Sequence, residues 1–583
     1  MTTLRNAILT ALKSLLRGRS LLQAILAFWF NPTAVEAATD RTAKVDGTAR
    51  RSIKDFLKEA DELLLQPIEP DELKTLSRRF KAQFRERLWN NPSCMLPSYN
   101  HQLPAGHEQG QYLSLDVGGS TLRVALVELR GRGLKGQESE IVRMRSFKIT
   151  PEIKKLEGMA FFDWMAVRIH ETVSESLQAD HSEKAIPMGL AWSFPIEQTS
   201  LKGGLLQGMG KGFLAANGLL GQDLGEVIQF ACRKQKLNVE LAAIVNDSTA
   251  ALLSQSYVSP TTRFGLILGT GVNIAVHLPT CTVHRSKFGT RPSSWFDKAS
   301  HVIINTELGM FGHDILPLTR WDKLLKAAHP KPEFQPLEHL LSGYYLGEIC
   351  RLALVEAIET TGIFGGVVPE SLLSPYSLDT ETLSIIEEYV DYLSPPPCQC
   401  LPFLFSLSLS LTNPLDRDTS STLDTALDTF RTRHPSTAAP TRLDMTALRT
   451  LASFISRRSA AIVAACVSGL WELKAEAEAE YLESLVSASA SASAEAPPSS
   501  FAAAAETRAE LDILHTVVAF NGSVIERYPG YLAACQRYVD ELVVAAAGPN
   551  AAGAASVELI PAHESSLLGA AVALACLEEG KAN

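Results

Sequence analysis

An aspartate between an apolar strand and an alanine-rich helix start is the first residue whose chemistry needs explaining. In AAIVNDSTAALL, Asp247 follows the apolar run and precedes Ser248 and Thr249. A side chain at this place could cap the helix, or it could act as the general base for a hydroxyl that attacks phosphorus. Phosphoryl transfer needs such a base, a held hydroxyl and electrostatic cover for the phosphates. Both interpretations stay open on this motif alone.

Two glycine-rich turns flank this aspartate in the sequence. LDVGGSTLRVALVEL places Asp116 at a predicted strand end and Arg123 on the outgoing strand, and LILGTGVNIAV repeats an apolar strand with a glycine turn after it. Such turns can present N–H groups and hydroxyls to phosphate oxygens, and Asp116 could orient a water on nucleotide-bound Mg²⁺. Plain hairpins have the same pattern, so only the pair of turns favours a polyphosphate site. The turn residues are Gly118, Gly119, Ser120 and Thr121, and then Gly269, Thr270 and Gly271.

A lysine lies in a third glycine-rich stretch, GLAWSFPIEQTSLKGGLLQGMGKGF, which covers residues 189–213. Lys211 does not fit the phosphate-loop pattern GxxxxGK[ST], because Gly212 follows it. On spacing alone, Lys211 could hold a phosphate, hold a substrate hydroxyl or lie in solvent.

The elements that must position these residues alternate between strands and helices. Apolar residues at helical spacing predict a helix in RSIKDFLKEADELLLQ. YLSLDVGG with TLRVALVEL, AIPMGLAWSFP, and LAAIVNDS with RFGLILGTGVNIAVHL predict strands, and GYYLGEICRLALVEAIE predicts a later helix. This alternation is typical of an α/β fold, and a chain of 583 residues is long enough for two or three domains.

Composition excludes several classes of protein. The chain is 46% hydrophobic and 20% charged, with a net charge of −10, and an extended basic surface for nucleic acid is not expected. The nine cysteines are scattered along the chain, which argues against a disulfide framework or a zinc site and favours a reducing compartment.

The first fifty residues differ from the rest. No acidic residue precedes Glu36, whereas Arg5, Lys13, Arg17 and Arg19 are basic, and LLQAILAFWF is too short to span a bilayer. We predict that residues 1–30 form a basic amphipathic segment that lies on a membrane surface, mitochondrial above all, or directs the protein there. A surface helix docked on the protein body is the alternative. Residues 31–50 are predicted to be a linker.

Two stretches look inserted. Residues 394–414 combine proline and cysteine with alternating Leu and Ser, which indicates an edge strand or non-coding sequence retained in the gene structure. Residues 475–506, AEAEAEYLESLVSASASASAEAPPSSFAAAAE, are of low complexity, and we predict disorder or a fraying helix there.

The motifs, in their order and spacing, resemble those of the eukaryotic hexokinase family within the actin-like ATPase superfamily. LDVGGSTLRV and GTGVN resemble its two phosphate motifs, VNDSTAAL its catalytic motif and AFNGSVIERYPGY its adenosine motif. SFPIEQTS with GMGKGF, NTELGMFG and LEHLLSGYYLGEICR resemble its sugar loops and the helix that follows. The resemblance runs from about Ser52 to the C-terminus.

The resemblance implies a two-lobed actin-like (ribonuclease H-like) α/β fold with a sugar and ATP cleft between the lobes. Residues 51–245 would form the small lobe and 246–583 the large lobe. The implied activity is ATP-dependent phosphorylation of a hexose 6-hydroxyl with Mg²⁺, as in glycolysis, in the cytoplasm or at the outer mitochondrial membrane. Asp247 would be the base and Lys211 would cover developing charge. The implied sugar contacts are Ser193, Phe194, Asn246, Asn273, Glu307 and Glu338, and ATP would meet both glycine turns, Asp116, Arg123, Gly522 and Ser523.

Three departures from the family pattern keep alternatives open. The family usually reads W-T-K-G-F where this chain has MGKGF, so Gly210 stands in place of a threonine that contacts sugar. Asn521 replaces an aspartate, and AHESSLLGAA replaces a glycine-richer motif. N-acetylglucosamine kinase activity and a non-catalytic sugar sensor are therefore the alternatives to a kinase for glucose or a related hexose.

Overall fold

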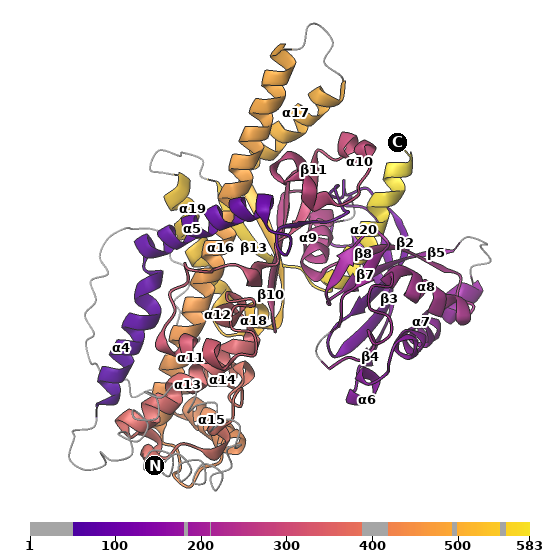
Figure 1. The fold of residues 1–583 in the computed structure, drawn as a ribbon. Helices are drawn as coiled ribbons and strands as arrows, with labels where there is room; N and C mark the ends of the chain where they lie inside the picture. The colour runs from indigo at the N-terminus through magenta and orange to yellow at the C-terminus, as the bar shows by residue number, and fades with distance from the viewer. Residues whose placement is uncertain are drawn as a thin grey trace, which may run out of the picture.

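The protein has two lobes, each built on its own β-sheet (Figure 1). The computed structural model describes residues 51–133, 135–179, 185–209, 212–387, 418–491, 498–547 and 555–582. The predictions for residues 1–50 and for 394–414 lie outside these residues. Strands and helices alternate along the described chain, as the sequence predicts.

The first sheet carries the first glycine turn. Its order is β4 (Ser139–Lys148), β3 (Thr121–Leu129), β2 (Gly110–Val117), β5 (Ile186–Trp192) and β8 (Val239–Val245). β2 and β3 form an antiparallel hairpin, and β5 and β8 extend the sheet in parallel. Apolar side chains of β2 and β5 pack with those of α7 (Met159–Ala179) and α8 (Leu224–Lys234) in the core of this lobe.

The second sheet repeats this topology around the second glycine turn. Its order is β1 (Leu96–Pro97), β11 (His301–Asn305), β10 (Val272–Pro279), β9 (Thr262–Leu268), β12 (His515–Asn521) and β13 (Ser556–Pro561). β9 and β10 form the antiparallel hairpin, and β12 and β13 continue in parallel. The two glycine turns therefore occupy equivalent corners of two equivalent sheets.

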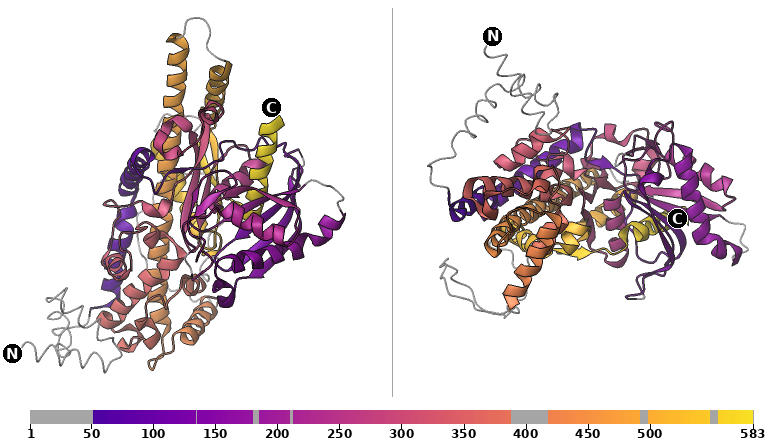
Figure 2. Two further views of the ribbon diagram at one scale, coloured as in Figure 1. Left: turned by 45° about the vertical axis from the view of Figure 1, so that its right-hand side comes forward. Right: turned by 90° about the horizontal axis from the view of Figure 1, so that it is seen from below.

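Two helices cross between the lobes and pack on each other. α9 (Asp247–Val258) follows the first sheet but packs on β9, and α20 (Ser565–Ala582) follows the second sheet but packs on β2 and β5. The approach is close enough to require glycine. A Cβ on Gly265 would lie 2.2 Å from the carbonyl oxygen of Ser248, and one on Gly569 would lie 2.1 Å from that of Ala250. The lobes are thus joined through a tightly packed helix pair, of which α20 is the yellow helix that leads to the C-terminus in Figure 2.

Helices cover the second sheet and build the larger core. This core joins apolar residues of α4 (Ile53–Leu65), α5 (Pro70–Asn90), α13 (Gly343–Thr361), α16 (Arg442–Ser491) and α19 (Tyr531–Ala547). α4 and α13 confirm the helices predicted from their apolar spacing. α4 and α5 precede the first sheet in the sequence but pack in the core of the second lobe, and α20 follows the second sheet but packs on the first. The position of these segments along the chain therefore does not tell to which lobe they belong.

Disorder and a helix were the two alternatives predicted for residues 475–506, and the described part of this stretch is helical. Residues 475–491 continue α16, and α17 (Pro498–Leu511) follows, so that the two form a hairpin at the top of Figure 1. Alanine and glutamate favour helix, and charged residues fix the base of the hairpin. The carboxylate of Glu510 accepts hydrogen bonds from Arg263 at 2.6 and 2.5 Å, and Lys474 lies 2.8 Å from it.

The remaining elements are short or peripheral. One stretch of the described chain, residues 442–487 of α16, is long and apolar enough to cross a bilayer, and 78% of its apolar window is buried, as in a core helix. The other helices are α6 (Pro151–Lys154), α10 (Ser293–Lys298), α11 (Arg320–Ala328), α12 (Glu338–Leu341), α14 (Thr380–Glu387), α15 (Asp418–Arg433) and α18 (Ser523–Arg527). A small sheet pairs β6 (Ile196–Gln198) with β7 (Gly204–Leu206). The 3₁₀ turns are η1 (Gln66–Ile68), η2 (Thr280–Thr282), η3 (Arg285–Phe288), η4 (Leu308–Met310), η5 (Ile363–Gly366) and η6 (Glu370–Leu373).

Candidate active site

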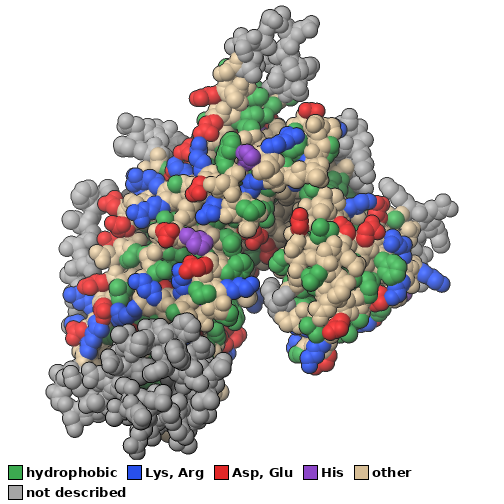
Figure 3. All heavy atoms as spheres, viewed as in Figure 1, with side chains coloured by type: hydrophobic (Ala, Val, Ile, Leu, Met, Phe, Trp, Pro, Cys, Tyr) green, Lys and Arg blue, Asp and Glu red, His purple; other side chains and the backbone are tan. Residues whose placement is uncertain are grey.

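The predicted site residues gather where the two lobes meet. A hollow opens between the lobes in the space-filling view (Figure 3). β8 ends at Val245 and α9 begins at Asp247, so the predicted base lies at the crossing from the first lobe to the second.

The start of α9 separates the two roles that the sequence left open. Asn246 is the N-cap, because its Oδ1 accepts a hydrogen bond from the N–H of Thr249 at 2.8 Å. Asp247 is the first residue of the helix, and its Oδ1 accepts from the N–H of Ser248 at 2.8 Å. The Nδ2 of Asn246 is buried and has no partner among the described residues, so it can donate to a ligand. Asp247 is therefore not needed as the cap.

Polar side chains from β10 and β11 form the side of the site in the second lobe. The Nδ2 of Asn273 donates to Asn305 Oδ1 at 2.8 Å, and the Nδ2 of Asn305 donates to Glu307 Oε1 at 2.7 Å. Glu307 follows β11 and adopts a left-handed backbone conformation with φ of 51°. These contacts bring the predicted sugar residues Asn273 and Glu307 together.

The environment of Glu307 makes its ionisation sensitive to its neighbours. Burial raises the pKa of this carboxyl, hydrogen bonds from Asn305 and Asn273 lower it, and the charge of Asp247 raises it. The net direction is upward. The electrostatic coupling to Asp247 connects the predicted base with the sugar side of the site.

Glu338 connects the sugar side to the second glycine turn. It begins α12, and its Oε2 accepts a hydrogen bond from the N–H of Val272 at 3.2 Å. A Cβ on Gly271 would lie 3.0 Å from the same oxygen. The glycine therefore allows this carboxylate to lie against the turn.

The second glycine turn also meets the predicted adenosine motif. A Cβ on Gly269 would lie 3.3 Å from the nitrogen of Ser523. Gly522 has φ of 133°, and a Cβ there would lie 2.3 Å from the carbonyl oxygen of Leu268. Only glycine fits such a backbone approach. The structure thus places Gly522 and Ser523 against the end of β9, with Thr270 in the turn itself.

In the first lobe, the glycine turn lies beside a partly buried ion pair. The N–H of Gly118 donates to the carbonyl of Thr121 at 3.0 Å and closes the turn around Gly119 and Ser120. Arg123 donates to Asp116 Oδ2 at 2.9 and 2.6 Å. Burial raises the pKa of Asp116, whereas the charge and hydrogen bonds of Arg123 lower it, and the net direction is upward.

A residue without a predicted role completes this ion pair. Glu564 lies at the start of α20, where the chain passes from β13 to the first lobe, and it pairs with Nη1 of Arg123. Sequence spacing could not reveal this contact, since the two residues lie 441 positions apart. Asn305 was also missed, although it stands in the NTELG motif two residues before Glu307.

Three predicted residues lie between β5 and α8, and the structure describes two of them, Ser193 and Phe194. The N–H of Ser193 donates to the carbonyl of Val117 at 3.4 Å, which places Ser193 beside the first glycine turn. Phe194 is 6% exposed, and its ring packs on Phe213 with 5.0 Å between centroids. Phe194 therefore packs against the core of the first lobe, and its contact with a sugar stays a prediction. Lys211 lies outside the described residues, as does Gly210.

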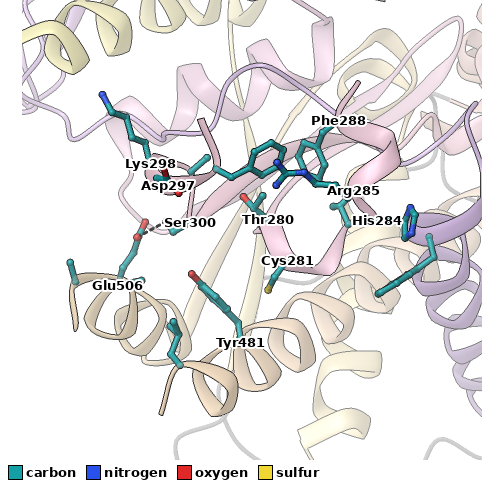
Figure 4. Close-up of a pocket in the computed structure, with 17 residues that line it drawn as sticks. Thr280, Cys281, His284, Arg285, Phe288, Asp297, Lys298, Ser300, Tyr481 and Glu506 are labelled. Atoms are coloured by element: carbon teal, nitrogen blue, oxygen red, sulfur yellow. Dashed lines mark hydrogen bonds between the residues drawn. The ribbon is translucent and has the colours of Figure 1, made fainter. Parts of the chain in front are cut away.

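A separate cavity of about 770 Å³ lies between the β10–β11 connection and the α16–α17 hairpin (Figure 4). Thr280, Arg285 and Phe288 line one side, and Tyr481 and Glu506 line the other. None of the predicted site residues lines this cavity.

The hexokinase family profile matches the chain in two parts, residues 62–257 and then residues 263–394 with 402–576. The chain is 33% identical to hexokinase-2 of Candida albicans over 329 residues, which is 55% of this chain and 66% of that protein. It is 32% identical to hexokinase-1 of Schizosaccharomyces pombe over 347 residues, or 58% of this chain and 68% of that protein. In each of these relatives and others like them, the matched region covers about two thirds of the relative's own length or less.

A solved structure has the same fold. The hexokinase from Schistosoma mansoni, complexed with glucose, superposes with a TM-score of 0.65 and 24% identity, covering 90% of this chain and 100% of that one. The predicted two-lobed α/β fold and the predicted family are confirmed by these comparisons.

Proposed function

The chain belongs to the hexokinase family, and from this premise we propose that it transfers the γ-phosphoryl group of ATP to the 6-hydroxyl of a hexose. One observation carries the proposal. Asn246 caps the crossing helix, and Asp247 is the first residue of that helix, beside the Asn273, Asn305 and Glu307 cluster.

Each group of side chains has a separate task in this reaction. Asn246, through its unpartnered Nδ2, and the carboxylates of Glu307 and Glu338 supply donors and acceptors for sugar hydroxyls, each of which both donates and accepts. The Asp247 carboxylate accepts the proton of the attacking hydroxyl. The two glycine turns hold phosphate oxygens from opposite lobes, and closure of the lobes excludes water. From its place in the sequence, Lys211 would cover the charge that develops on the transferred group.

The residues around Asp116 fit a Mg²⁺ ion that arrives with ATP. Arg123 occupies Asp116 Oδ2, and no described residue donates to Oδ1. That oxygen can accept from a water on the ion, which itself would neutralise phosphate charge. Binding through water agrees with the sparse protein ligation that Mg²⁺ usually has.

The direct test is ADP release with a panel of glucose, mannose, fructose and N-acetylglucosamine. We expect ADP release with at least one hexose. Tight binding of a sugar without ADP release would contradict the proposal and favour a non-catalytic sugar sensor.

Gly210 bears on which sugar is preferred. A glycine in place of the family's threonine removes a hydroxyl next to Lys211 in the sequence, and we propose that the smaller residue admits a sugar substituent such as a 2-acetamido group. We expect Gly210→Thr to strengthen glucose binding by about three- to tenfold, or roughly 0.5–1.5 kcal/mol, which is the value of one hydrogen bond. The measurement is kcat/KM for glucose and for N-acetylglucosamine. A ratio that does not move toward glucose would show that Gly210 does not set specificity.

We also propose that residues 1–30 attach the protein to a membrane surface, mitochondrial above all, without spanning it. Basic charge and apolar area act together in such segments, so high salt is expected to release part of the bound protein. The measurement is the location of a reporter fused to residues 1–35. A wholly cytosolic reporter would refute the attachment.

A further inference from the structure

Asn305 lies at the centre of a directional chain of hydrogen bonds that ends on Glu307. The Oδ1 of Asn273 accepts from the N–H groups of Ile274 at 2.9 Å and Leu308 at 3.3 Å. Because main-chain N–H groups can only donate, this end of the Asn273 amide must be oxygen and the other end must be nitrogen. The Nδ2 of Asn273 then donates to Asn305 Oδ1 at 2.8 Å.

The orientation of the Asn305 amide follows from that of Asn273. Since Asn305 Oδ1 accepts from Asn273, its Nδ2 must face Glu307, and it donates to Oε1 at 2.7 Å. The Nδ2 of Asn273 also reaches Oε1 at 3.4 Å. Oε1 therefore has two donors, whereas Oε2 accepts no hydrogen bond in the described part of the chain. One carboxylate oxygen is held and the other is left for a ligand.

Asn305 also supports the backbone that carries this carboxylate. Glu307 has φ of 51° and ψ of 56°, a left-handed conformation that few residues other than glycine adopt. Asn305 Oδ1 accepts from the N–H of Glu307 at 3.3 Å, as in an Asx turn. A single amide thus holds both the main chain and the side chain of Glu307.

We infer that Asn305 is a positioning residue of the phosphoryl-transfer site: it orients Glu307 so that Oε2 accepts a hydroxyl of the bound hexose. This inference rests on the proposed function, because a hexose must occupy the site. Asn273 belongs to the same series of hydrogen bonds, because its Nδ2 donates to both Asn305 and Glu307.

The electrostatics of the cluster give the inference a specific signature. The charged group that faces Glu307 from α9 is Asp247, which raises the pKa of Glu307, and Asn305 lowers that pKa. Cys94, from the segment after α5, has its own pKa raised to about 11, chiefly by burial and slightly by Glu307. Loss of the Asn305 donor should raise the pKa of Glu307 further. Protonation would then remove its acceptor as the pH falls.

Two substitutions of Asn305 should respond to pH in opposite directions. In Asn305→Ala, we expect the hexose Kd to rise about tenfold, and to rise further toward acid pH as Glu307 becomes protonated. In Asn305→Asp, the introduced carboxyl can donate to Glu307 only while it is protonated, so hexose binding should weaken as the pH rises. A side chain with a purely structural role would not produce opposite trends.

The measurement is hexose Kd by calorimetry between about pH 5.5 and 8.5, with kcat and KM alongside. Ile303→Val, a buried position on the same strand, is the matched control, and its Kd profile should follow the wild type. Profiles of the two Asn305 variants that match the wild type, or that shift in one direction, overturn the inference. So does a wild-type protein that binds no hexose. Hexose binding without ADP release refutes the proposed transfer alone, and the Kd profiles still decide the role of Asn305.

Discussion

Asp247→Asn is expected to lower kcat by about 10³-fold, within the usual range for loss of a general base. The amide keeps an oxygen that can accept from the N–H of Ser248, as Asp247 Oδ1 does at 2.8 Å. Asn246 continues to cap α9 through its contact with Thr249. The substitution therefore removes proton acceptance without removing the helix start, and Asp247→Ala should give a similar loss.

An unchanged hexose Kd together with a lower kcat would distinguish the loss of a base from the loss of a binding residue. A base acts mainly in the transition state, so hexose Kd should change little while kcat falls. Asp223 is a control at another helix start: it precedes α8, and its side chain caps that helix by accepting from the N–H of Glu226 at 3.1 Å. Asp223→Asn should leave kcat near the wild-type value. A kcat for Asp247→Asn within a few-fold of the wild type would contradict the assignment.

Local motifs predicted the positions of the glycine turns and of Asp247, because each depends on a few neighbouring residues. The alternation of apolar strands with Gly118 and Gly119, and later with Gly269 and Gly271, sufficed to place two hairpins. The same reasoning left hairpin, cap and catalytic interpretations open. Resemblance to a family, rather than spacing, selected among them.

Contacts between distant segments could not be predicted in this way. Residues 475–506 are of low complexity, and their sequence does not show the distant residues that contact the described part of this stretch. One of these is His301, whose side chain is 1% exposed and lies 3.0 Å from Glu478. Phe194 stands in a sugar-loop motif, yet its ring packs in the core with Phe213. Burial and pairing depend on the three-dimensional neighbours, which a one-dimensional pattern does not contain.

Arg458→Met is expected to lower the free energy of unfolding by about 3–5 kcal/mol, as when one partner of a buried ion pair is removed. Arg458 of α16 and Asp322 of α11 have side-chain exposures of 0% and 1%. Their two hydrogen bonds measure 2.7 and 2.8 Å. Asp322 also accepts from Thr319 in the capping box of α11, so the pair joins a helix start to the core helix. Without Arg458, a buried carboxylate would lack its counter-charge.

The pH dependence of this loss has a definite sign. Burial raises the pKa of Asp322, but Arg458 and Thr319 outweigh burial and bring the pKa below its ordinary value. The wild-type pair therefore stabilises the fold above the unfolded pKa of about 4 and loses this contribution as the pH falls through the folded pKa. In Arg458→Met, the hydrogen bonds from Thr319 remain, but without the charge of Arg458 burial should raise the pKa of Asp322. Urea unfolding should then show a larger deficit at about pH 7 than at about pH 5.

Two further variants separate the charge effect from a general disturbance of α16. Arg442 lies on the same helix and pairs with Asp424 at 2.7 Å, but the two side chains are 54% and 49% exposed. Arg442→Met should leave unfolding nearly unchanged, since exposed pairs contribute little. Asp322→Asn combined with Arg458→Met should recover part of the loss, because the double variant no longer buries an unpaired charge. If Arg458→Met and the double variant were equally stable, the loss would come from packing and not from the unpaired Asp322 carboxylate.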